Sequence, residues 1–270
     1  YTTNTDLFIG LKPSEVTRNQ DYRLQLEGPI LRGKLNYFIN YRYQNNKNHL
    51  NGVRRFLMTD YSDYSSDNRN EWFDIHNGDS SYVPMNSGEY STVFGKLTYR
   101  PLPDLKLTAS ITHDDNYWGS YQHAWKYNPD GVARSYESSD LYSFTLNHSI
   151  SQKLFYEAKY SYLENYFGNY RYKNPLDGRY IHDRYASSVG PGFLTGGQQK
   201  GHTTRLQKDQ TAKLDLTWQV HKNHSLKAGL LYIEHVLDNK SYTILNLYRN
   251  KDTEFENYFD PDQNTWIYPN

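Results

Sequence analysis

The clearest pattern in the chain is a strict alternation of polar and apolar side chains over residues 21–44. From 21 to 27, charged or amide residues occupy the odd positions, and Tyr or Leu occupies the even ones. Successive side chains of a strand point to opposite faces, so this stretch predicts a strand with one polar and one apolar face. The alternation resumes from 35 to 44 after a turn at 28–33, which predicts a hairpin.

Three further segments alternate in the same way and predict three more hairpins. They are 93–112 with a turn at 101–104, 142–162 with a turn at 151–153, and 211–232 with a turn at 221–224. Together they predict eight antiparallel strands of about 9 to 12 residues in an all-β fold.

The connections alternate between short turns and long loops, which fall at 45–87, 114–139 and 165–208. A structureless loop of about 40 residues is unusual in a compact soluble domain. Strands of this length with short turns at one end and long loops at the other are typical of an outer-membrane β-barrel. A soluble β-sandwich is the alternative, because its strands alternate too.

This arrangement also predicts how the faces are used and how much of a barrel is present. Lys213 and Asp215 stand in the middle of an alternating strand, so we expect the polar face to line a lumen. If the short turns are periplasmic, residues 1–19 and 238–270 both lie on the extracellular side. We therefore expect residues 1–270 to be a middle portion, about eight strands, of a larger up-and-down transmembrane barrel.

Composition narrows the classes of function. The 270 residues include 28 Tyr, and aromatic residues make up 16% despite a mean hydropathy of −0.94, a composition suited to interfaces. The formal net charge is zero, which disfavours nucleic acid as a partner. The absence of Cys excludes disulfides and Cys-ligated zinc. No apolar run reaches the roughly 18 residues of a membrane helix.

Catalytic and metal-binding motifs are weak. Sequence motifs of serine hydrolases, zinc proteases and phosphate-binding loops are absent, so no enzyme activity and no cofactor are predicted. Asp260, Asp262 and Asn264 have the spacing that opens a calcium loop, but Thr265 replaces the turn Gly. His113 with its neighbouring acids is a second weak candidate. Neither is predicted to hold a metal.

Two groups of residues are candidate functional residues. The first group consists of charged residues on the predicted lumen face, where they would contact a plug or line a polar path, or pair across strands and stabilise the wall. These residues are Arg23, Glu27, Arg42, Lys96, Arg100, Lys106, Glu157, Lys159, Lys213 and Asp215. The second group consists of loop aromatics that would stack on a ligand or pack loop against loop. These residues are Trp118, Tyr121, Trp125 and Tyr127.

A third set has an interfacial role. Aromatic residues on the apolar face are predicted to form a girdle at the lipid interface. These residues are Tyr37, Tyr41, Tyr99, Tyr160, Tyr162 and Trp218.

Two short stretches carry a resemblance to a known family. Leu-Glu-Gly-Pro-Ile at 26–30, followed by a turn and Leu-Asn-Tyr-Phe-Ile at 35–39, resembles an early barrel hairpin of TonB-dependent receptors. The receptors with a carboxypeptidase-regulatory-like N-terminal domain are the most similar. Asn-His-Ser-Ile-Ser at 147–151, followed by Leu-Phe-Tyr at 154–156, resembles a periplasmic turn of the same family.

The resemblance implies a barrel of about 22 strands closed around a plug. It implies import of a scarce ligand such as a siderophore, corrinoid, glycan or peptide, driven by the TonB complex across the bacterial outer membrane. The expected partners are outer-membrane lipid, the protein's own plug domain, TonB and an extracellular small ligand. This sequence lacks the plug and the TonB-contacting box. A passive porin or a surface ligand-binding barrel is the alternative, and a secreted β-sandwich binding module is the third possibility.

Overall fold

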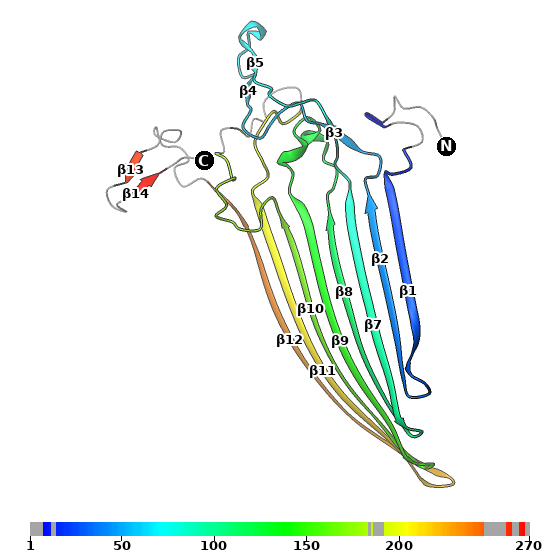
Figure 1. The fold of residues 1–270 in the computed structure, drawn as a ribbon. Coiled ribbons are helices and arrows are strands. Elements are labelled where there is room, and N and C mark those ends of the chain that lie inside the picture. The colour runs from blue at the N-terminus through cyan, green and yellow to red at the C-terminus, as the bar shows by residue number, and fades with distance from the viewer. Residues whose placement is uncertain are drawn as a thin grey trace.

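The computed structural model describes residues 8–11, 15–182, 185, 192–245, 258–260 and 265–267. Its main feature is one eight-stranded antiparallel sheet in which the strands lie side by side in the order in which they occur along the chain (Figure 1). The strands are β1 (Asn19–Leu31), β2 (Leu35–Asn46), β7 (Gly88–Leu102), β8 (Leu105–Trp118), β9 (Arg134–Ser151), β10 (Leu154–Tyr170), β11 (Gly201–His221) and β12 (His224–Thr243). The four predicted hairpins and their order are confirmed. The apolar sides of the hairpins share one sheet and do not face each other across two.

The predicted strand lengths are wrong for every strand of the sheet except β2, which has 12 residues, because the strands extend to as many as 21 residues. They continue past the alternating segments through polar pairs such as Glu164 with Lys208 and Asn165 with Gln207. A backbone ladder needs only paired N–H and C=O groups, so it extends where the side chains are polar on both faces. As a result, Trp118 is the last residue of β8 and does not lie in a loop.

Successive hairpins are staggered along the sheet. Tyr99 pairs with Leu35 at the start of β2, and β7 then continues three residues further, to Leu102. The next two hairpins repeat this step: the pairs are Leu105 with His148 and Leu154 with Trp218, and the strands end at Ser151 and His221. The short turns therefore step along the sheet from β1–β2 to β11–β12 (Figure 1). Three residues are about 10 Å along a strand, and two strand spacings are also about 10 Å, so the strands run at about 45° to the line of turns.

The segments that join the hairpins at the other end pack together into a cap, defined by residues 47–87, 119–133 and 171–200 without the undescribed positions. The sequence pattern predicted a structureless loop here, but residues 47–87 contain short elements. These are β3 (Asn51–Val53) paired with β6 (Tyr82–Pro84), β4 (Ser62–Asp63) paired with β5 (Phe73–Asp74), and the 3-10 turn η1 (Arg69–Glu71). The β4–β5 hairpin projects furthest from the sheet in Figure 1. Two more 3-10 turns, η2 (His123–Trp125) and η3 (Pro129–Gly131), lie in the second segment.

Backbone hydrogen bonds join the three cap segments. The Phe56 N–H donates to Tyr127 O at 2.9 Å, Leu194 N–H to Ala124 O at 2.7 Å, and Gly197 N–H to Met58 O at 2.7 Å. Such contacts satisfy loop backbone groups that no local element would pair. Each cap segment is therefore held in place by hydrogen bonds to the other two.

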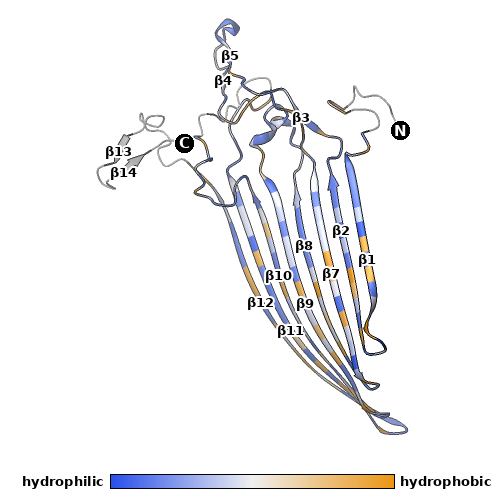
Figure 2. Cartoon of the chain, viewed as in Figure 1, coloured by the Kyte–Doolittle hydropathy of each residue, from blue (hydrophilic) through white to orange (hydrophobic). Residues whose placement is uncertain are grey.

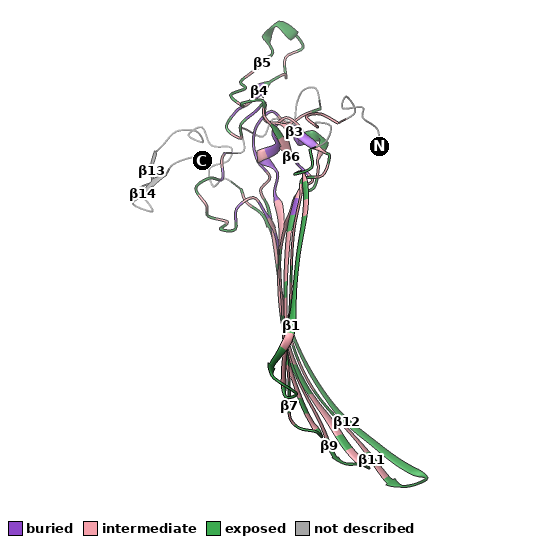
Figure 3. Cartoon of the chain, turned by 45° about the vertical axis from the view of Figure 1, so that its right-hand side comes forward, coloured by how far each residue is buried: buried purple, intermediate pink, exposed green. Residues whose placement is uncertain are grey.

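Apart from Tyr170 at the end of β10, the buried hydrophobic residues that the structure describes lie in the cap. Met85, Trp125 and Val132 form a cluster against which Tyr121 and Leu194 pack, and Trp125 is only 8% exposed. Figure 3 shows the buried residues gathered at the cap, while the strands are partly or fully exposed. Over the half nearer the short turns, the sheet therefore presents both faces uncovered. Outside it, β13 (Tyr258–Asp260) pairs with β14 (Thr265–Ile267). Within the described ranges, no helix has both the length and the apolar character needed to cross a membrane.

We predict that Trp125→Ala loosens the cap and leaves the sheet intact. Removing a buried Trp from a packed cluster costs about 3–5 kcal/mol. Hydrogen exchange should therefore lose protection at the Leu194 and Gly197 amides, while amides in the middle of β9 and β10 keep theirs. Trp72→Ala is the matched control, because Trp72 is 39% exposed. Unchanged protection at Leu194 in Trp125→Ala would contradict the assignment of this cluster as the core of the cap.

Candidate functional site

The register places the apolar side chains of the hairpins on one face of the sheet, which we call the apolar face. One continuous row of paired residues shows this for seven strands. The row is Tyr37, Leu97, Ala109, Phe144, Tyr160, Ala212 and Tyr232. The predicted girdle residues share this face, since each of them pairs with an apolar-face residue such as Val93, Leu107 or Leu226. Their position at a lipid interface stays a prediction.

The apolar face is hydrophobic only over the half of the sheet nearer the short turns (Figure 2). On β9 this half covers residues 142–150, about 27 Å of strand. Phe144 is 46% exposed and Leu230 is 73% exposed. An uncovered apolar area that extends across eight strands exceeds what monomeric soluble proteins expose. We call this area the apolar band.

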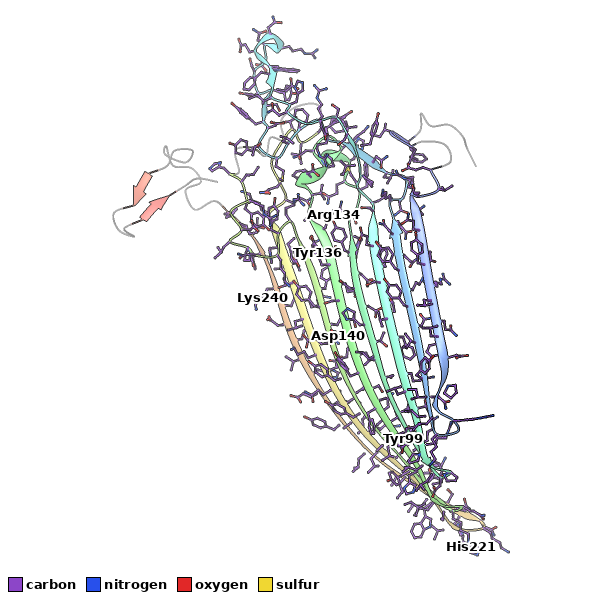
Figure 4. The ribbon with its side chains drawn as sticks, in the orientation of Figure 1. Tyr99, Arg134, Tyr136, Asp140, His221 and Lys240 are labelled. Carbon is purple, nitrogen blue, oxygen red and sulfur yellow. The ribbon has the colours of Figure 1, made fainter. Side chains whose placement is uncertain are left out.

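A row formed by a histidine and charged residues bounds the apolar band on the side towards the cap. His113 Nδ1 lies 2.8 Å from Asp140 Oδ1, and Lys208 Nζ lies 3.0 Å from Glu164 Oε2. The register joins these pairs into one row across β8, β9, β10 and β11. In Figure 4, Asp140 lies between Tyr136 at the cap end and Tyr99 near the turns. On these four strands, the same face thus changes from apolar to charged towards the cap.

The predicted lumen residues lie on the opposite face, which we call the polar face. Glu27 pairs with Phe38, which pairs with Lys96, and the alternation places Arg23, Arg42 and Lys106 on this side too. On the far strands, Glu157 pairs with Asp215 and Lys159 with Lys213. Arg100 lies at the irregularity between Tyr99 and Leu102, so the register does not assign its face. The sequence pattern was therefore sufficient to predict which charges share a side.

Ion pairs within the sheet neutralise part of this set. Asp21 Oδ2 lies 2.9 Å from Nη2 of both Arg23 and Arg42, and Lys213 Nζ lies 2.6 Å from Asp215 Oδ2. Within the ranges that the structure describes, Glu27, Lys96, Glu157 and Lys159 form no ion pair. The Asp21 and Asp215 contacts are the cross-strand pairing that one predicted role requires, while a role of the other charges towards a partner stays a prediction.

The loop aromatics do not form one surface. Trp118 lies on the polar face, with ring centroids 6.5 Å from Tyr90 and 6.3 Å from Phe167. Trp125 is in the core of the cap, which favours its packing role. Tyr127 packs edge-on against Phe193 with centroids 4.7 Å apart. The Tyr121 hydroxyl lies 3.0 Å from His123 Nδ1, and burial raises the pKa of Tyr121. A ligand role for these residues stays a prediction.

A second aromatic group, which the sequence pattern did not reveal, lies at the cap end of the apolar face. Its five rings come from five neighbouring strands, with successive centroid distances of 5.3, 4.8, 4.9 and 5.1 Å. We call it the aromatic ladder; it consists of Tyr117, Tyr136, Tyr170, His202 and Tyr242. The sequence did contain a signal for this group. Tyr166, Gly168 and Tyr170 continue the two-residue period of the strand beyond its predicted end.

The segment 171–182 covers the middle of the aromatic ladder. Tyr170 is 4% exposed and His202 is 2% exposed. His202 Nε2 lies 3.1 Å from the carbonyl oxygen of Lys173, so this nitrogen carries the proton and donates. Burial raises the pKa of Tyr170, which keeps its hydroxyl neutral.

The described residues contain no group of three or more His, Asp or Glu side chains that could hold a metal ion. His113 and Asp114 point to opposite faces of β8, and Asp114 instead accepts a hydrogen bond from the Thr92 hydroxyl at 2.6 Å. The side chains of Asp260, Asp262 and Asn264 lie outside the described residues.

No protein-family model matches the chain, and no curated protein is significantly similar to it. The resemblance to TonB-dependent receptors therefore rests on the two short stretches alone.

We predict that Arg179 holds the pKa of Asp177 well below its usual value. Arg179 Nε and Nη2 donate to the two carboxylate oxygens at 2.9 and 2.7 Å, which lowers the pKa of Asp177 from 3.8 to about 2. Because the folded-state pKa is depressed, the pair contributes to stability above about pH 4 and loses this contribution as the pH falls towards 2. The NMR titration midpoint of the Asp177 carboxyl should lie near 2 and rise towards 3.8 in Arg179→Met.

Arg171→Met is the control for this titration, because Arg171 forms no ion pair among the described residues. Its Asp177 midpoint should stay near that of the unsubstituted protein. A midpoint near 3.8 before any substitution would show that the ion pair does not persist in solution.

Proposed function

We propose that the eight-stranded sheet is part of the wall of an outer-membrane β-barrel. The observation that carries the proposal is the sorting of side chains by the register, with an uncovered apolar band on one face and charged residues on the other. Strands that cross a bilayer need a lipid-facing apolar band about 25 Å tall. A strand length of about 27 Å inclined at about 45° spans roughly 20 Å, and the flanking Tyr and Trp side chains extend it.

The stagger of the hairpins supports the same proposal. Closing a sheet into a barrel requires strands tilted by about 35–45° and a steady offset in register. The three-residue step between successive hairpins corresponds to such a tilt. A flat sheet in a sandwich needs no such regular offset. In the described part of the chain, β1 and β12 each pair with one strand only, so closure would need further strands.

We further propose that the barrel belongs to a TonB-dependent receptor that imports a scarce ligand. The support is the resemblance at 26–39 and 147–156 together with the polar face, where Glu27, Lys96 and Lys159 are free of ion pairs in the described residues and available to a plug domain. The cap would then form part of the extracellular mouth. Import driven by TonB follows from the family resemblance.

Spin labels on neighbouring residues of β9 test the barrel proposal. Phe144 is on the apolar band and Ser143 is on the polar face one residue away. The chain contains no Cys, so Phe144→Cys and Ser143→Cys each give a single label. In lipid vesicles, we expect the label at 144 to collide more often with oxygen, which dissolves in lipid, and the label at 143 with a water-soluble nickel chelate. Equal accessibility at both positions, or the reverse order, would end the proposal.

Planar-bilayer conductance separates a receptor from a porin. A barrel filled by a plug should conduct no ions, so the complete protein isolated from its own membrane should show no conductance steps. Removal of the plug domain from the same protein should produce them. Open channels in the intact protein would favour the porin, whose lumen is water-filled.

A further inference from the structure

A cleft lies at the cap end of the apolar face, between the sheet and the segment 171–179. Its volume is about 520 Å³, within the range of small-ligand sites. Asp115, Tyr136 and Tyr166 form its floor on β8, β9 and β10, and all three occupy apolar-face positions. In Figure 4, Tyr136 marks its place, above the charged row that contains Asp140. The cleft therefore opens on the side opposite to the polar face that the proposed import path uses.

The charges around the cleft are segregated by sign. Its acid on the apolar face, Asp115, comes from β8, whereas its bases, Arg171, Lys173 and Arg179, come from the covering segment. Arg179 is paired with Asp177. In the ranges that the structure describes, Asp115, Arg171 and Lys173 form no ion pair, and Arg171 Nε is buried without a hydrogen-bond partner. Unpaired charges beside a cavity are costly unless water or a ligand completes them.

The aromatic walls are held in place before any ligand arrives. Tyr136 and Tyr170 are stacked, with centroids 4.8 Å apart and an interplanar angle of 14°. The guanidinium groups of Arg171 and Arg179 lie 5.2 and 4.1 Å from the centre of the Tyr172 ring. A wall of stacked rings loses little conformational freedom on binding. The cleft thus has the features of a preformed site.

We propose that this cleft binds a small zwitterion, a molecule with an ammonium group at one end and a carboxylate or phosphate at the other. The ammonium would donate to the Asp115 carboxylate. The anionic end would accept from Arg171 and Lys173. A ligand with a single anionic charge would leave Asp115 without a partner. Two sources share this chemistry: a free short peptide, and an ethanolamine phosphate head group of a membrane lipid.

Calorimetry with blocked peptides tests the proposal. Trialanine has both charges at neutral pH, N-acetyl-trialanine lacks the ammonium, and trialanine amide lacks the carboxylate. We expect trialanine to bind the purified chain in detergent, and each blocked peptide to bind at least about tenfold more weakly, as the loss of a charge-assisted hydrogen bond predicts.

Two variants assign the two ends. Asp115→Asn should weaken trialanine about tenfold and leave N-acetyl-trialanine unchanged, because that peptide has no ammonium to lose. The double variant Arg171→Met with Lys173→Met should weaken trialanine binding by a similar factor. It should leave the binding of trialanine amide unchanged, because that peptide has no carboxylate to lose. A role in structure alone would weaken all three peptides equally, and that result would overturn the proposal. If the double variant does not fold, the comparison with Asp115→Asn still decides it.

A control and a second ligand complete the design. Lys240→Met changes a cation on the same face that is already paired with Asp238 at 2.7 Å, so it should leave every affinity unchanged. Soluble glycerophosphoethanolamine that binds more tightly than trialanine would identify a lipid head group as the source, and the reverse order a peptide. If neither binds at millimolar concentration, the cleft is not a zwitterion site.

Discussion

The backbone ladder between neighbouring strands is the constraint on which the rest of the structure depends. Because side chains alternate along each strand and the register between the strands is unbroken away from the short turns, the facing direction of one residue sets that of a whole row. A slip by one residue would move Phe144 and Tyr160 to the polar face and Lys159 to the apolar face. The continuous register thus keeps eight separate amphipathic segments in one two-sided surface.

Like charges meet in this ladder and are offset by their neighbours. Lys159 pairs directly with Lys213, which is unfavourable, but the next pair on the same face is Glu157 with Asp215. Opposite charges are therefore adjacent along the strands, and the 2.6 Å contact of Lys213 with Asp215 is one result. Such an arrangement neutralises the wall without apolar packing. It is compatible with the proposed lumen, where water or a plug would complete the hydrogen bonds.

The cap and the sheet are stabilised by different means. The cap has a small hydrophobic core around Trp125 and backbone bonds between segments far apart in sequence. The sheet has ladder hydrogen bonds and an apolar band that no described residue covers. A surface of that kind is stable only where lipid or another protein excludes water from it. The proposed membrane location would meet this need, while the aromatic ladder and the cleft lie beyond the band.

The alternation of side chains determined the four hairpins, their order and the grouping of Arg23, Arg42, Lys96 and Lys213 on one face, because each of these depends only on a period of two. The tertiary structure alone decided how far the strands extend, since polar residues such as Asn165 and Gln207 pair through their backbones and leave no hydrophobic signal. It also decided the fate of the loops. Trp125 is buried because segments more than sixty residues apart in sequence meet around it. The hydrogen bond that the Asn128 side chain donates to Gly197 O is one contact between these segments. The cleft depends on the same kind of contact, because Arg171 and Lys173 line it together with Asp115 only when the chain folds back over the sheet. Local patterns do not encode such distant contacts.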